Sequence, residues 1–318
     1  MSEATSVVKP EVWEEYLQTL HRHFYETAAD QCLLWVNPAH GDVFGEDPLV
    51  EERRVRVPIS HPNFNVELAP YLVPLTLSKS RDADVFKRSV QTAWEAWTLS
   101  SLSSFNGQPI GGWVQSSIAP QVLARHWATH CHLHAVKHLN KLLRFHDPGV
   151  REWLWATFSS AQRRQLLGNV ESIFAIGRNQ DLIQHRWEIQ PQASAQAFTK
   201  LTLTEEQWEH VNNFATVHKA WLECCLADPK FRSVQAKKPH WEQGVYDALR
   251  QASIYGINDT QDRVLFAMHA LTVGDDFHNH RKLQALWKLT QAGDYYGSAL
   301  EDISGHPAEK IQDYLSSD

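Results

Sequence analysis

The sequence lacks several features that would assign the protein to a membrane, secreted or disulfide-rich class. It has four cysteines among 318 residues, and its one adjacent pair, Cys224 and Cys225, has a spacing that rarely forms a disulfide. No apolar run approaches the roughly 20 residues that a bilayer-spanning helix needs. Residues 1–4 show no basic region followed by an apolar stretch, so no secretory signal is expected. We therefore expect a cytoplasmic protein with no membrane contact, in a compartment that keeps thiols reduced.

Positive charge and familiar catalytic motifs are missing as well. The formal net charge is -7, which does not favour nucleic acid as a partner. The chain has no Gly-x-Ser-x-Gly elbow, phosphate-binding loop, dinucleotide-binding glycine motif, His-Glu-x-x-His or Cys-x-x-Cys. Paired carboxylates such as Glu14-Glu15 and Glu205-Glu206 lie in polar stretches that are typical of solvated faces. We expect a protein that is not an enzyme and uses no cofactor.

Tryptophan and histidine, in contrast, are abundant, with 13 and 18 residues. Tryptophan buries much surface at little entropic cost, so it fills cores and anchors interfaces. The sequence favours large cores as the main use of the indoles, with exposed anchors as the second.

The apolar spacing predicts an α+β protein: an N-terminal α/β lobe with a mixed sheet, then an all-α helical lobe. Strands are expected at 31–36, 53–59, 71–77, 111–116, 142–146, 172–177 and 186–189. Helices are expected between them at 10–28, 83–99 and 118–140. The polar segment 190–197 has no periodicity and predicts a linker, which divides the chain into domains 1–190 and 191–318. Later helices are expected at 204–226, 238–255, 259–273, 282–291 and 294–302.

The segment 142–170 carries the most specific pattern. A short apolar strand stops at Asp147, whose carboxylate can cap the helix that begins with Pro148. Gly168 is expected to end the next helix in a left-handed conformation. Arg144 alternates with apolar neighbours, so it should face the opposite side and can form a bidentate ion pair. The favoured interpretation is that Arg144 and Asp147 are structural.

Two histidine clusters leave a metal-binding alternative open. His126, His130, His134 and His138 recur every four residues on the expected helix 118–140, a spacing that can chelate zinc. Residues 275–280 read Asp-Asp-Phe-His-Asn-His. The first cluster adjoins an apolar stripe without a carboxylate neighbour, and the acids of the second can cap a helix. We expect no metal, and keep a metal-dependent hydrolase as the alternative function.

Taken together, these motifs resemble the adaptor-chaperone family of the bacterial type VI secretion system. The resemblance covers roughly residues 30–180, beginning with an opening strand at Leu33–Asn37. It is carried by Ser116 or Ser117, Leu123, His126, the run Arg144-Phe145-His146-Asp147-Pro148, Gln162 or Gln165, and Leu167-Gly168-Asn169-Val170. One departure is Trp127-Ala128, which stands where the family usually has Leu-Arg.

The resemblance implies a non-catalytic adaptor that binds the N-terminal segment of a toxin effector. It would load the toxin onto the C-terminal region of a spike protein without being secreted itself. The structural signature residues are then His126, Arg144, Phe145, Asp147, Pro148 and Gly168. Candidate exposed anchors for the partner are Trp208, Trp221, Trp241 and Trp287.

Overall fold

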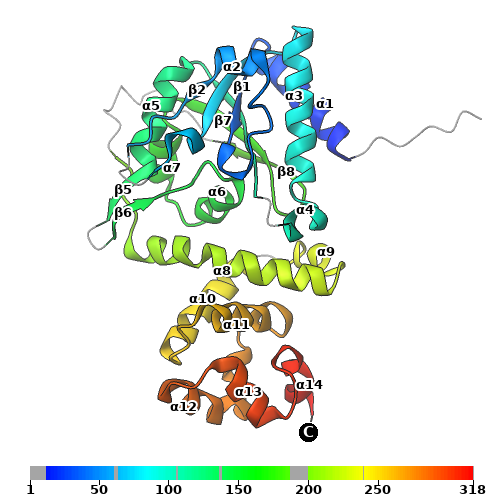
Figure 1. Cartoon of the computed structure of the whole chain (residues 1–318), viewed down its shortest axis with the longest axis vertical. Helices are drawn as coiled ribbons and strands as arrows, with labels where there is room; N and C mark the ends of the chain where they lie inside the picture. Colours follow the sequence, from blue (N-terminus) through cyan, green and yellow to red (C-terminus); the bar gives the residue numbers. More distant parts are fainter. Residues whose placement is uncertain are drawn as a thin grey trace, which may run out of the picture. The chain divides into compact units, whose positions relative to one another are not determined.

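The structure is a computed structural model that describes residues 12–60, 64–104, 107–135, 138–186, 200–238 and 240–317, with side chains outside 132–141. The chain forms two compact units, Met1–Leu203 and Thr204–Asp318 (Figure 1). The first contains the sheet and the second is helical, so the predicted α+β class is confirmed. The predicted linker 190–197 lies outside the described residues.

Unit 1 is built on a six-stranded sheet with the order β2-β3-β1-β4-β7-β8. Its strands are β1 (Gln31–Val36), β2 (Val55–Arg56), β3 (Tyr71–Thr76), β4 (Ile110–Ser116), β7 (Val170–Ile176) and β8 (Leu182–Arg186). Every neighbouring pair of these strands is antiparallel, which corrects the expected mixed sheet. The alternation of strands and helices was misleading because the helical crossover joins β3 to β4. These two strands run in the same direction, but β1 lies between them and is antiparallel to both.

Helices cover the sheet of unit 1. They are α1 (Val12–Thr27), α2 (Pro48–Arg53), α3 (Ser80–Glu95), α4 (Leu99–Ser103), α5 (Pro120–Cys131), α6 (Pro148–Trp155) and α7 (Ser160–Leu167). Two short 3-10 turns, η1 (Pro38–His40) and η2 (Val66–Leu68), follow strands or precede them. Helices α1 and α3 pack side by side (Figure 1). Rings of Phe24, Phe86, Trp113 and Phe174 meet edge to face beneath them, so this side of the sheet is closed by aromatic packing.

The chain reverses into a hairpin where a long helix was expected. Helix α5 ends at Cys131, and β5 (His132–Ala135) pairs with β6 (His138–Leu142). The predictions of a helix over 118–140 and of a strand over 142–146 are therefore wrong at these bounds. Four-residue spacing of histidine matches a helix, but the cross-strand hydrogen bonds of a hairpin satisfy the same backbone groups through a non-local pairing.

Unit 2 contains only helices among its described residues. They are α8 (Glu205–Ala227), α9 (Phe231–Gln235), α10 (Trp241–Ile254), α11 (Thr260–Thr272), α12 (Gln284–Ala292), α13 (Tyr296–Ser304) and α14 (Ile311–Ser316). Short 3-10 turns occupy Phe277–Asn279, Arg281–Leu283 and Ala308–Lys310. The predicted capping box of Thr204 and Gln207 is confirmed at the start of α8. In the part of the chain that the structure describes, no helix has the length and apolarity to cross a membrane.

Candidate functional site

Four of the six signature residues, Arg144, Phe145, Asp147 and Pro148, lie where α6 begins. The Asp147 carboxylate accepts hydrogen bonds from the backbone N–H of Gly149 at 2.9 Å and of Val150 at 3.3 Å. Pro148 occupies the first turn, where its missing N–H costs nothing. The predicted cap is therefore confirmed, and it fixes the direction in which the chain leaves the hairpin.

Three aromatic rings pack behind this helix start. Trp35 of β1 stacks on Trp127 of α5 with ring centroids 3.9 Å apart. Phe145 meets the edges of both, at 5.6 Å and 6.1 Å. The Trp127 indole N–H also donates to the carbonyl of Leu166 at 3.1 Å. Trp127, the residue that departs from the family pattern, thus fills the core between the sheet and α5.

A buried arginine that the sequence did not reveal sits in the same cluster. Arg151 is 1% exposed and donates to the carbonyls of Phe145 at 3.1 Å and Gly111 at 2.6 Å. Its guanidinium lies over the Trp35 ring, 5.4 Å from the centroid. Burial lowers the pKa of Arg151 to about 10, against the opposing effect of the Asp147 charge. Its position four residues after Asp147 was the available signal, but flanking Val150 and Trp153 made the face look purely apolar.

Arg144 does not form the buried ion pair that its alternation suggested. Its side chain is exposed, and the structure gives it no hydrogen bond or ion pair with another described residue. Leu143 and Phe145 on either side are fully buried. The predicted opposite orientation is thus found, although the residues lie after β6 and not within a strand. Arg151, not Arg144, is the cation that holds the motif together.

His126 and Gly168 form a direct contact within the signature. Gly168 ends α7 with φ +63° and ψ -122°, a positive φ as expected but outside the left-handed helical region. A Cβ there would come within 2.7 Å of the Nε2 atom of His126. The same histidine nitrogen lies 3.3 Å from the Leu166 carbonyl oxygen. Both residues therefore belong to the packing of α5 against α7.

The histidine clusters do not come together as a metal site in the described structure. His130 is fully buried and its Nδ1 accepts from the backbone N–H of Leu201 at 3.1 Å. Burial lowers the pKa of His130 to about 3. His134 and His138 lie on the two strands of the hairpin rather than on the helix with His126. Among described residues, including Asp275–His280, no group of three or more His, Cys, Asp or Glu side chains could hold a metal ion.

The tryptophans proposed as exposed anchors are mostly buried. Trp208, Trp221 and Trp287 are 2%, 0% and 5% exposed, and Trp241 is half-buried. Trp287 stacks on Tyr255 at 4.2 Å and donates to the carbonyl of His278 at 3.1 Å. The expected exposure is therefore wrong for three of the four.

A cavity of about 690 Å³ opens in unit 1 beside η1. Its wall includes His40, and the imidazole Nε2 of His40 lies 3.9 Å from the Asp147 carboxylate. The remaining lining residues are Val43, Thr92, Glu95, Ala96, Thr98, Ser100, Ser101, Gly107 and Pro109. His40 therefore connects the signature cluster to a hydroxyl-lined hollow.

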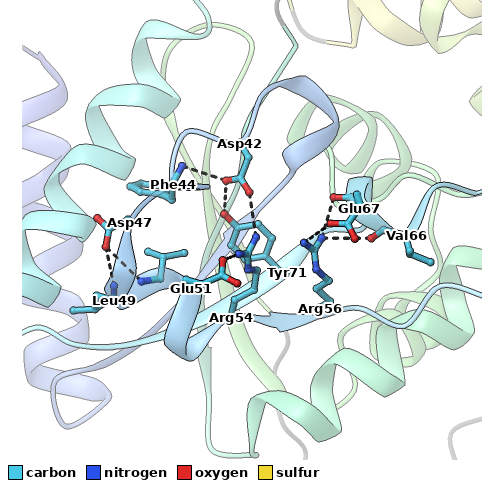
Figure 2. A network of polar contacts seen from close by, with 11 residues as sticks. Asp42, Phe44, Asp47, Leu49, Glu51, Arg54, Arg56, Val66, Glu67 and Tyr71 are labelled. Carbon is cyan, nitrogen blue, oxygen red and sulfur yellow. Dashed lines mark hydrogen bonds and ion pairs between the residues drawn. The ribbon is translucent and has the colours of Figure 1, made fainter.

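A second polar network fastens the segment after η1 to the edge of the sheet. Figure 2 shows Asp42 accepting from the Tyr71 hydroxyl at 2.5 Å and from the Phe44 N–H at 3.2 Å. Arg54 pairs with Asp42 at 3.5 Å and contacts Glu51. Burial and the bond to Asp42 raise the pKa of Tyr71 well above its usual value, so its hydroxyl stays protonated.

A separate group of contacts connects η2 to β2. Arg56 donates to the carbonyl of Glu67 and pairs with its carboxylate, both at 2.9 Å (Figure 2). The short β2 strand and these charges blunt the sheet edge, a common protection against unwanted strand pairing. The network thus reads as a support for the edge of unit 1.

Comparison with protein families finds one match. Residues 63–165 match the model of a domain of unknown function, DUF4123. No curated protein and no solved structure matches the chain. The matched residues run from before η2 to within α7 and include the Arg144–Pro148 motif.

Proposed function

We propose that the chain is a non-catalytic cytoplasmic adaptor of a type VI secretion system, which binds a toxin effector and brings it to the spike protein. The observation that carries the proposal is the DUF4123 match at residues 63–165. That range contains His126 and Arg144–Pro148, which are among the residues on which the resemblance to the adaptor family rests.

The roles of the signature residues support a binding protein. Asp147 caps a helix, Phe145 packs between two indoles, and Gly168 touches His126. Each of these residues gives the first unit a fixed shape. A rigid scaffold is what an adaptor needs, because a preorganised surface loses less conformational entropy when a partner binds.

The division of the chain offers two surfaces for two partners. Units 1 and 2 are each compact by themselves, so a toxin and a spike protein could each use a different unit. Linked binding modules of this kind gain overall affinity without new contacts, through a raised effective concentration.

Co-purification tests the proposal. The tagged chain would be co-expressed with the toxin and the spike protein encoded beside its gene, then captured at moderate salt. We expect both partners to be retained, and a toxin from an unrelated locus to be lost in the wash. Retention of neither neighbouring protein would overturn the adaptor function.

A further inference from the structure

Arg144 is an exception within its own motif. Leu143 and every residue from Phe145 to Val150 are buried, whereas the Arg144 side chain is exposed and without an ion pair or hydrogen bond to another described residue. Arginine presents five donors in a planar fork that matches a carboxylate in two parallel hydrogen bonds. The structure places this fork at the surface with its donors available.

The surroundings of Arg144 contain both cationic and anionic groups. The cluster includes His40, His146, Arg151 and the two acids Asp147 and Glu152. The Asp147 carboxylate already accepts two backbone N–H bonds and lies 3.9 Å from His40. Burial, reinforced by the charge of Arg144, lowers the pKa of His146 to about 3, so His146 is neutral at pH 7. Arg151 interacts with both acids, Asp147 and Glu152, whereas no described carboxylate forms an ion pair with Arg144.

The cavity beside His40 supplies further polar groups. Its wall carries the hydroxyls of Thr98, Ser100 and Ser101. Among the described lining residues, Glu95 is the one carboxylate, and it accepts a hydrogen bond from the Gln91 amide at 2.7 Å. A Cβ at Gly107 would overlap the His40 ring, so this loop packs directly against the imidazole. A peptide segment in this hollow would meet these hydroxyls and lie beside His40, on which the charge of Arg144 acts.

We propose that Arg144, with His40 and the adjoining hydroxyl-lined cavity, forms the docking point for an acidic peptide segment of the toxin effector. An Asp or Glu side chain of that segment would pair with the Arg144 guanidinium. The proposal rests on the adaptor function, and adds to it the place and the charge of the contact. Charge complementarity at such a point mainly sets specificity and the rate of association.

Affinity measurements with the purified N-terminal segment of the neighbouring toxin test this assignment. Arg144→Ala should weaken binding about tenfold, Arg144→Glu should weaken it further, and Arg144→Lys should lie between Ala and the native residue. Because Arg144 is exposed and without a described partner, the melting temperature should stay unchanged in all three variants.

The matched control is Arg125→Glu, a charge reversal at an exposed arginine on α5 of the same unit. We expect its affinity for the toxin segment to stay within about twofold of the native value. Affinity of Arg144→Glu should return when an acidic residue of the toxin segment is replaced by lysine. That rescue distinguishes a direct charge pair from a general effect of net charge.

The outcomes separate this proposal from the adaptor function. If the native chain binds the toxin and all Arg144 variants bind it within about twofold, the docking point is wrong and the adaptor function stands. If only binding of the spike protein's C-terminal region responds to Arg144, the proposed occupant is wrong. If the native chain binds neither protein, the adaptor function itself fails.

Discussion

The two units differ in whether their interiors contain charged side chains. Within the described parts of the chain, all buried Asp, Glu, Lys and Arg residues lie in unit 1: Asp82, Asp147, Arg151 and Arg178. Unit 2 buries neutral polar groups instead, such as His269, which bonds the Tyr296 hydroxyl at 2.7 Å and the Ala308 carbonyl at 2.9 Å. Interior ions tie distant segments together, as Arg151 ties α6 to β4. The stability of unit 1 should therefore be more sensitive than that of unit 2 to single substitutions and to pH.

The largest expected difference between the two units is in their loss of stability at low pH. Burial lowers the pKa of His130, His146 and His185 in unit 1 to about 3, and that of His269 in unit 2 to about 4. The unfolded chain binds these protons near pH 6.5, so stability is fully present above that pH and falls as the pH drops, to about pH 3 for the unit 1 histidines and about pH 4 for His269. Each buried histidine contributes a slope of up to about 1.4 kcal/mol per pH unit.

We therefore expect unit 1 to lose protection first as the pH is lowered from 7. Hydrogen exchange with mass spectrometry resolves the two units in the intact chain. If unit 2 loses its protection from hydrogen exchange at a higher pH than unit 1, the expected greater acid sensitivity of unit 1 is contradicted.

Arg151→Met should be the most damaging single substitution at neutral pH. It leaves the carbonyls of Phe145 and Gly111 and the charge of Asp147 without their partner, at a cost of about 3–5 kcal/mol in the free energy of unfolding. Chemical denaturation measures the loss. The control is Arg144→Met, the same change at an exposed position, for which we expect less than about 0.5 kcal/mol. Equal losses at the two positions would refute the assigned roles.

Gly168→Ala should cost about 2 kcal/mol, because its backbone conformation is open mainly to glycine and a Cβ meets His126. The double variant with His126→Ala removes the clash but not the backbone strain. It should therefore show less loss from Gly168→Ala than the native background, as a double-mutant cycle in denaturant would measure. If the losses from the two substitutions simply add, the contact between Gly168 and His126 is contradicted.

Removal of a helix cap should have the smallest effect on stability. One aspartate cap in each unit gives a matched pair for this comparison. Asp147 caps α6 in a buried position, and Asp259 caps α11 in an exposed one with bonds of 2.8 Å and 3.1 Å. Asp→Ala should cost about 1 kcal/mol at Asp259. The cost at Asp147 should be about 2 kcal/mol, since water cannot reach the N–H groups that lose their acceptor. Thermal unfolding of the two variants compares them, and the reverse order would argue against the buried cap.

Local signals in the sequence predicted local features well. The caps at Asp147 and Thr204, Pro148 in the first turn of α6 and the end of α7 at Gly168 follow from residue types in the immediate neighbourhood. The same holds for the α+β class, since strand and helix periods differ over a few residues.

Features that depend on distant pairing were not predicted. The β5–β6 hairpin replaced the expected helix because histidines at 126, 130, 134 and 138 satisfy a helical period, while strand pairing leaves no such local mark. The antiparallel order of the sheet and the reach of Arg151 to Gly111 are also non-local. In unit 2 an exposed and a buried tryptophan have the same spacing along a helix, so the burial of Trp208, Trp221 and Trp287 depended on which helices pack together.

Deletion of the gene in its native cells tests the central claim most directly, with toxin secretion followed in the culture medium. The account predicts that the toxin stays inside the cells while the spike protein is still secreted, and that the native gene restores toxin export. Unchanged toxin export in the deletion strain would contradict the adaptor function.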